Sequence, residues 1–141
     1  MESVLLHGAQ CWSLTVAQTR SLDGTYTRLL RKALNVHFSA HMTNAELYGE
    51  IPRVSITLSK RRLQFAGHCY RRLDQPVHSA MFYNPVGVFR RGGHVRLNYV
   101  KELIRDTGMT ERELPTAMLN RDVWRTVYVE RGDRRSIDRR R

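Results

Sequence analysis

The chain has 141 residues, which is enough for one compact domain with a single core and tails. Its 24 Lys and Arg against 13 Asp and Glu give a formal net charge of +11 at pH 7. Nearly all of this charge is arginine, whose guanidinium group can bind a phosphate through two parallel hydrogen bonds. No stretch approaches the roughly 20 apolar residues that span a bilayer, and no secretory signal is recognisable. We therefore expect an intracellular protein, nuclear or cytoplasmic, that is neither secreted nor bound to a membrane.

Candidate residues for metal binding or catalysis are sparse. Cys11 and Cys69 lie 58 positions apart without a CxxC pair, so we expect free buried thiols and no disulfide framework. His37 and His41 have the spacing of two metal ligands, but they lie in an expected loop without a cysteine pair. The clustered carboxylates of metal-dependent phosphoryl transfer are missing. The sequence predicts no enzyme activity, no metal site and no cofactor.

The first long helix is expected from its capping residue and its apolar spacing. Thr15 is placed to cap a helix in which apolar residues recur every three or four positions as far as Leu34, and Asn35 is placed to end it. This periodicity leaves basic side chains for solvent or phosphate. Those we expect to contact nucleic acid are Arg28, Arg31 and Lys32.

A second long helix, expected over residues 54–73, is the most informative segment. Its core side is expected to carry Leu58, Phe65, Cys69 and Leu73. The other side has a polar, basic row that we expect to contact a phosphate backbone: Arg61, Gln64, His68, Arg71 and Arg72. Gly67 inside this helix costs up to about 1 kcal/mol relative to alanine, which indicates a close approach to the backbone by a partner helix or by a nucleic-acid strand.

Shorter helices complete the pattern. Thr43 with Glu46, and Thr110 with Glu113, have the spacing of capping boxes, although Pro115 favours a start at Leu114 for the second of these helices. The helices expected besides the two long ones cover residues 43–48, 76–83 and 95–106, a segment from 110 or 114, and a last segment with Trp124 and Val127. Residues 131–141 carry six Arg and two Asp without an aromatic residue, which is typical of a solvated tail.

These elements predict an all-α fold, a compact bundle of about six helices with a basic disordered C-terminal tail. We expect residues 1–53 to form one helical segment, residues 54–130 to form a second segment packed on it, and residues 131–141 to form the tail.

The order of several short motifs indicates a family. The motifs are SVLLHGAQCW, LDGTYTRLLRKALNV, TNAELYGEIPRVS, RRLQFAGHCYRRLDQPV, an NPVG loop, RDTGM and NRDVWR. In this order the chain, over about residues 2–128, resembles the C-terminal region of reverse transcriptases encoded by non-LTR (LINE-like) retrotransposons. It departs from the family in HGAQCW, where relatives typically have YGSETW, and in RGGH, where they often have RGRP.

The resemblance implies a function for the chain. The family's RNA-directed DNA polymerase has its catalytic palm before this region, followed by a helical thumb that grips the template-primer duplex. The chain is similar to the thumb and the segment after it, so we expect a nucleic-acid-binding fragment without a polymerase or endonuclease active site. Its expected partners are an RNA, DNA or hybrid duplex and the remainder of a reverse transcriptase. The alternatives are a helical protein-interaction module and a non-functional remnant of a transposable element.

Overall fold

The structure, a computed structural model, describes residues 2–83 and 98–133, and within these ranges it is helical without a strand, which confirms the all-α prediction. The described part has eight α-helices and two 3-10 helices, where about six helices were expected. In chain order they are α1 Glu2–Leu5, η1 Ala9–Cys11, α2 Val16–Ala33, η2 Phe38–Ala40, α3 Asn44–Tyr48, α4 Val54–Tyr70, α5 Pro76–Phe82, α6 Tyr99–Thr107, α7 Glu113–Leu119 and α8 Arg121–Asp133.

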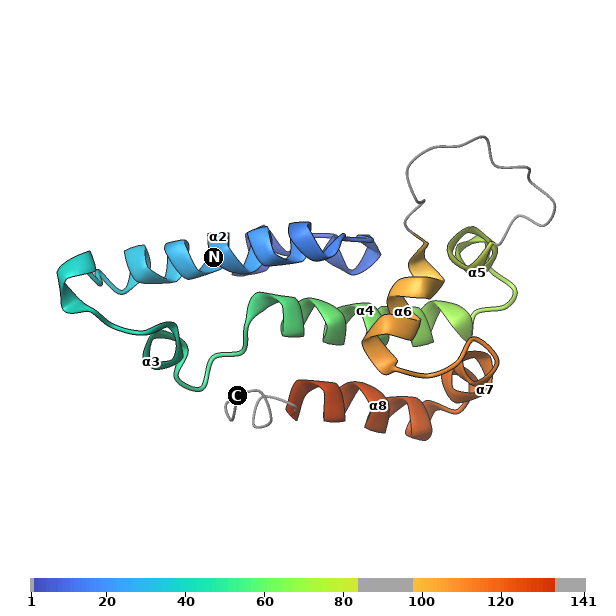
Figure 1. Ribbon diagram of the computed structural model, residues 1–141. Coiled ribbons are helices and arrows are strands. Elements are labelled where there is room, and N and C mark those ends of the chain that lie inside the picture. The colour runs from blue at the N-terminus through green and yellow to red at the C-terminus, as the bar shows by residue number, and fades with distance from the viewer. Residues whose placement is uncertain (1, 84–97, 134–141) are drawn as a thin grey trace.

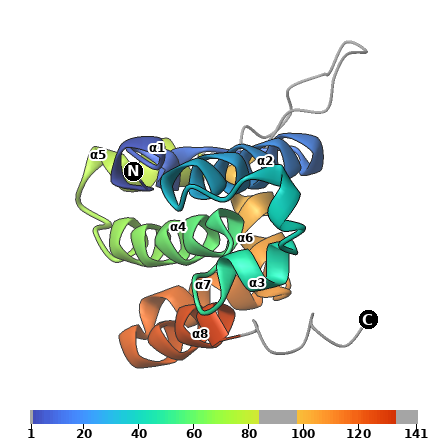
Figure 2. The ribbon, with the colours of Figure 1, turned by 90° about the vertical axis from the view of Figure 1, so that its left-hand side faces the viewer.

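Helix α4 is the centre of the bundle. Figure 1 shows α2, α4 and α8 side by side with α4 in the middle, and Figure 2 shows the same stack from another side. Helices α5, α6 and α7 gather around the later half of α4, and η1 packs against it as well. The helices α2, α5, α6, α7 and α8 and the 3-10 helix η1 are therefore all positioned by contact with α4.

Two hydrophobic clusters lie along α4, one at each half of the helix. The first is formed with the N-terminal segment, α2 and α3, and its buried residues are Leu6, Ala9, Tyr26, Tyr48, Val54 and Leu58. The second is formed with α6, α7 and α8, and its buried residues are Leu63, Ala66, Leu103, Leu114, Met118 and Trp124. Because α4 contributes to both clusters, packing continues across the expected boundary between residues 53 and 54.

The helix starts follow the capping residues in the sequence. The Thr15 hydroxyl accepts a hydrogen bond from the Gln18 amide and the Gln18 side chain accepts one from the Thr15 amide, which closes a capping box on α2. Thr43 and Glu46 form the same arrangement on α3. Both capping predictions are confirmed.

The capping residues before α7 also exchange hydrogen bonds. The Thr110 amide donates to Glu113 and the Glu113 amide donates to the Thr110 hydroxyl. Helix α7 begins at Glu113, so Pro115 falls in the first turn, where its missing N–H removes no intrahelical bond. The N-cap residue of α7 is Arg112, so the helix begins neither directly after Thr110 nor at Leu114, the two starts expected from the sequence.

The start of α4 is capped from another helix. Arg53, its N-cap residue, makes no side-chain capping bond. The Asp23 side chain of α2 caps the helix instead. Its carboxylate accepts hydrogen bonds from the Ser55 amide at 2.9 Å and from the Ser55 hydroxyl at 2.8 Å. Next to this contact, the hydroxyls of Thr27 and Tyr48 are 2.8 Å apart. The hydrogen bonds fix the crossing of α2 over α3 and the start of α4.

We predict that Asp23→Ala lowers the free energy of unfolding by about 1–2 kcal/mol, because it leaves two partly buried donors of Ser55 without an acceptor. Asp74→Ala removes the same charge at an exposed position and is expected to change the free energy of unfolding by less than about 0.5 kcal/mol. Urea titration followed by circular dichroism measures both. Equal midpoints for the two variants would contradict a capping role for Asp23.

Three expectations about the helix ends and the core are wrong. Helix α4 ends at Tyr70, so Leu73 follows it and is 63% exposed, and Phe65 is only half-buried. Ala33 and Leu34 are exposed because the last turn of α2 extends beyond the residues it packs on. Helix α8 continues to Asp133, so residues 131–133 of the expected tail are helical. Residues 134–141 and the expected loop and helix start within 84–97 lie outside the described residues.

Candidate nucleic-acid interface

The outward side of α4 carries a row of basic and polar side chains, which we call the α4 stripe: Lys60, Arg61, Gln64, His68 and Arg72. Gln64, His68 and Arg72 are exposed, and Lys60 and Arg61 are half-buried. Their spacings of three and four residues place them along one side of the helix and just past its end. Lys60 was not among the residues expected from the sequence, although it lies four positions before Gln64.

Arg71, expected in the same row, has a structural contact. Its Nη1 donates to the carbonyl oxygen of Met118 at 2.8 Å in a partly buried position. This bond connects the end of α4 to the end of α7 and satisfies a carbonyl in the last turn of α7. The neighbouring Arg72 is exposed and donates to the Gln75 side chain at 3.2 Å.

The candidate residues on α2 also include both exposed side chains and one that makes a structural contact. Arg28 and Lys32 are exposed, whereas Arg31 is half-buried and donates to the Met42 carbonyl at 2.7 Å and to Asn44 Oδ1 at 3.0 Å. Arg31 thereby holds the segment that leads into α3. Arg28 and Lys32 lie near the end of α2 that extends past the start of α4 (Figure 1), so the structure does not bring them together with the α4 stripe.

Acidic groups are scarce on these two helices. Helix α4 contains no Asp or Glu, and α2 contains only Asp23, which is directed to Ser55. The acidic groups that approach α4 from α6, Glu102 and Asp106, are buried on its opposite side. Lys60, Arg61 and Arg72 therefore place positive charge along the outward side of α4, and α4 itself contributes no acidic side chain.

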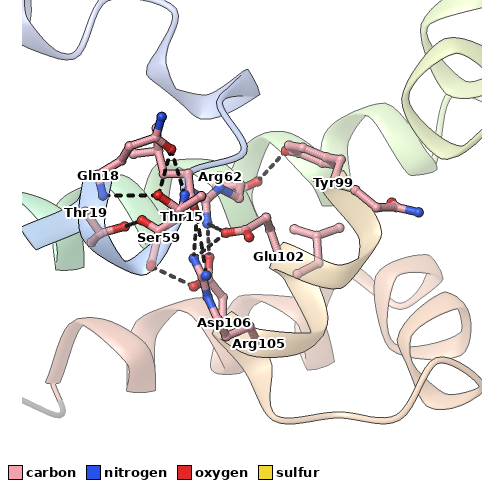
Figure 3. A network of polar contacts seen from close by, with 12 residues as sticks. Thr15, Gln18, Thr19, Ser59, Arg62, Tyr99, Glu102, Arg105 and Asp106 are labelled. Atoms are coloured by element: carbon pink, nitrogen blue, oxygen red, sulfur yellow. Dashed lines mark hydrogen bonds and ion pairs between the residues drawn. The ribbon is translucent and has the colours of Figure 1, made fainter. Parts of the chain in front are cut away.

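A buried ionic cluster holds α4 to α6, with Arg62 at its centre (Figure 3). The Arg62 guanidinium donates to Asp106 at 2.7 Å and to Glu102 at 3.4 Å. Ser59 also donates to Asp106, at 3.0 Å, and Arg105 forms an ion pair with Glu102. Burial raises the pKa of the Glu102 carboxyl, and the positive charges of Arg105 and Arg62 oppose this shift. Sequence reasoning missed the cluster because Arg62 stands next to Arg61 and was included in neither the core nor the basic row.

One signal in the sequence could have identified Arg62. It lies four residues after Leu58 and four before Ala66, on the side of α4 that faces the core. Glu102 and Asp106, also four apart, supply two negative charges on one side of α6, opposite in sign to Arg62. An arginine among core positions and such an acidic pair indicate a buried ion pair.

Tyr99 extends the buried polar region toward the N-terminal segment. Its hydroxyl lies 3.1 Å from the Gln10 carbonyl oxygen and 3.3 Å from the Arg62 carbonyl oxygen, so one donor serves two acceptors. Burial raises the pKa of the Tyr99 hydroxyl well above its ordinary value, which keeps it protonated as a donor. The residue connects η1, α4 and α6.

Gly67 on α4 is approached by a side chain of α8. A Cβ atom built on Gly67 would lie 2.3 Å from both Cδ1 and Nε1 of Trp124. The Trp124 indole is buried and donates to the Leu63 carbonyl at 2.7 Å. The predicted close approach at Gly67 is thus confirmed, and a partner helix makes it.

The residues considered for metal binding do not come together in a site in the described part of the chain. Among residues 2–83 and 98–133, no group of three or more His, Cys, Asp and Glu side chains is arranged to hold a metal ion. His37 bonds its own neighbour Ser39, with 2.9 Å between ring nitrogen and hydroxyl. Within the same residues, no helix is long and apolar enough to cross a membrane.

Comparisons with known proteins give no relative: no protein family, curated protein or solved structure matches this chain.

Proposed function

We propose that the chain binds duplex nucleic acid through the α4 stripe, chiefly by contacts to the phosphate backbone. The observation that carries the proposal is the outward side of α4, where cationic and hydrogen-bonding side chains follow one another on a helix without an acidic residue. Arginine, lysine, glutamine and histidine are all suited to phosphate oxygens, and none of these contacts requires a particular base. Binding with little sequence preference is the consequence.

The proposal agrees with the family that the sequence resembles. A fragment of a non-LTR reverse transcriptase with a thumb-like helical surface would grip a template-primer duplex and leave catalysis to the remainder of the polymerase. The chain would then act in the nucleus or cytoplasm, with nucleic acid and the rest of such an enzyme as partners. The basic charge of +11 supports attraction to a duplex at long range.

The first test is the salt dependence of binding. Fluorescence anisotropy with a labelled duplex is expected to give a linear fall of log affinity with log salt concentration. Three to four phosphate contacts correspond to a slope of about −3, because each contact releases condensed counterions. A flat plot would argue against backbone contacts and for binding through apolar residues.

A pair of charge reversals tests the position of the interface. Lys60→Glu with Arg72→Glu is expected to weaken duplex binding by about tenfold or more and to make the salt slope shallower by about 2. The matched control, Lys101→Glu with Arg112→Glu, changes the net charge equally at exposed positions on α6 and before α7. It is expected to weaken binding by less than about threefold. Equal losses for the two double variants would mean that binding depends on net charge and not on the α4 stripe.

The second candidate function is protein binding, and exposed apolar side chains favour it. Leu73, Leu119 and Val123 are 63%, 54% and 46% exposed; they lie just after α4, at the end of α7 and in the first turn of α8. A contiguous apolar surface formed by these side chains would be typical of a protein interface. This function predicts binding that persists at high salt and tolerates the change of Lys60 and Arg72.

A further inference from the structure

His68 lies in the last turn of α4, between two other members of the α4 stripe. Gln64 precedes it by four residues, and Arg72 follows it by four, just past the end of the helix. The Arg72 amide donates to the Cys69 carbonyl at 3.2 Å, so the backbone turns once more before it leaves α4. Side chains four residues apart on a helix have their Cβ atoms about 5–6 Å apart. A phosphate backbone that follows the α4 stripe therefore also meets the His68 ring.

The His68 side chain is available to a ligand. It is exposed, and within the described part of the chain it makes no hydrogen bond, ion pair or ring contact. His78, the histidine of α5, differs in this respect. Its ring packs on Tyr70 and Phe82 with centroids 5.1 and 5.5 Å apart. A phosphate group can thus bind His68 without breaking a contact inside the protein.

The acidic side chains of the elements that pack on α4 are mostly engaged elsewhere. Asp23 on α2 accepts hydrogen bonds at the opposite end of α4. Glu102 and Asp106 on α6 belong to the buried ionic cluster. Glu113 on α7 is bonded within its own capping segment. The element η1 has no acidic residue, and its Cys11 is exposed although a buried thiol was expected.

Exposed charges remain on α8 and in the turn after α4. They are of both signs: Arg121, Asp122, Arg125 and Glu130 on α8, and Asp74 in the turn. In the described part of the chain none of them contacts the His68 ring. A protonated His68 therefore has no counterion inside the protein, and a phosphate group of a bound duplex would supply one.

We propose that His68 binds phosphate in its protonated form, so that duplex binding by the α4 stripe takes up a proton at this residue; the inference rests on the proposed function. A histidine side chain changes its charge between about pH 5 and 8. The protonated ring donates from both nitrogens, and a phosphate next to it favours the charged form. Because the complex then holds more protons than its free components, the affinity must increase as pH falls.

The test measures binding of a labelled duplex to the full chain by fluorescence anisotropy at about pH 5.5 and about pH 7.5, at constant ionic strength. Circular dichroism at both values verifies that the chain is folded. The affinity is expected to be at least about fivefold higher at the lower pH, and the slope of log affinity against log salt is expected to be steeper there by about 0.9, as for one more phosphate contact. Calorimetry in buffers of different ionisation enthalpy is expected to show net proton uptake on binding.

Two variants of His68 separate its charge from its shape. His68→Gln keeps a hydrogen-bonding side chain that cannot be charged, and is expected to bind at both pH values as the parent chain does at the higher one. His68→Arg has a permanent charge, and is expected to bind at both values as the parent does at the lower one. The control is His41→Asn, which removes an exposed histidine before α3, at a positive φ of 47° that asparagine tolerates. It is expected to keep the pH dependence of the parent.

The possible failures can be told apart. A chain that binds no duplex at either pH would overturn the proposed function and this inference with it. Equal affinity of the parent chain at the two pH values would overturn the inference alone. So would a His68→Gln variant that keeps the pH dependence and the proton uptake of the parent, and both results would leave the α4 stripe as the duplex-binding surface.

Discussion

Replacing Gly67 by alanine is expected to lower the free energy of unfolding by about 1–2 kcal/mol, although alanine is the better helix former. The added Cβ would lie 2.3 Å from Cδ1 and Nε1 of the Trp124 ring, which is far shorter than the non-bonded contacts that Cβ atoms make. The ring cannot simply move away, because it is buried and its Nε1 donates to the Leu63 carbonyl at 2.7 Å. Overpacking of this kind costs about 1–3 kcal/mol or more and outweighs the gain in helix propensity of about 1 kcal/mol.

Gly24 on α2 offers a matched control. It is also a helical glycine, but it is exposed and a Cβ atom built there meets no other atom within 4 Å. Gly24→Ala is therefore expected to raise the free energy of unfolding by about 0.5–1 kcal/mol through helix propensity alone. Urea titrations of the two variants should shift in opposite directions. A stabilised Gly67→Ala variant would show that α8 does not pack on α4 as described.

The sequence predicted local structure well where one residue determines a helix end. Thr15 caps α2 as expected, and Thr43 with Glu46 forms the expected capping box on α3. The packing signal at Gly67 was also readable, because a glycine inside a strongly helical segment requires a close neighbour. That the neighbour is Trp124 depends on how α8 packs along α4, which no local pattern specifies.

Tertiary contacts explain where the sequence was a poor guide to the basic residues. Periodicity alone assigned Arg31 and Arg71 to the surface that contacts phosphate, but Arg31 bonds the segment before α3 and Arg71 bonds the end of α7. A guanidinium group has five donors and a long apolar stem, so it can satisfy distant backbone carbonyls as readily as a phosphate. Which arginine does so is decided by the carbonyls that other helices present. Among the expected residues on α4, Arg61, Gln64, His68 and Arg72 keep a place in the α4 stripe.

Replacing Arg62 by methionine is expected to lower the free energy of unfolding by about 3–5 kcal/mol, the largest loss among these variants. The Arg62 guanidinium is the partner of two buried carboxylates, Glu102 and Asp106, which are 5% and 4% exposed. Without it, Asp106 retains only the Ser59 hydroxyl and Glu102 retains Arg105. Leaving buried carboxylates without their cation costs far more than the pair contributes over an apolar replacement.

The stability lost in the Arg62→Met variant is expected to increase from acidic to neutral pH. Burial raises the pKa of Glu102 above its unfolded value, so this carboxyl favours the folded state below its unfolded pKa, and that contribution disappears as pH rises through the folded pKa. Removing the Arg62 charge raises this pKa further. The difference between Arg62→Met and the parent chain should therefore be smaller at pH 4 than at pH 7, as measured by urea titration at both values.

Two further variants separate loss of charge pairing from loss of packing. Arg62→Met combined with Glu102→Gln and Asp106→Asn buries no charge at the cluster and is expected to recover at least half of the lost stability, because neutral amides tolerate the apolar neighbour better than carboxylates do. Arg72→Met, at an exposed position after the same helix, is expected to change stability by less than about 1 kcal/mol. If the triple variant is no more stable than Arg62→Met alone, the guanidinium acts at this position through its shape and not through its charge. If the Arg62→Met variant is as stable as the parent chain, the ionic cluster is not the contact that holds α4 to α6.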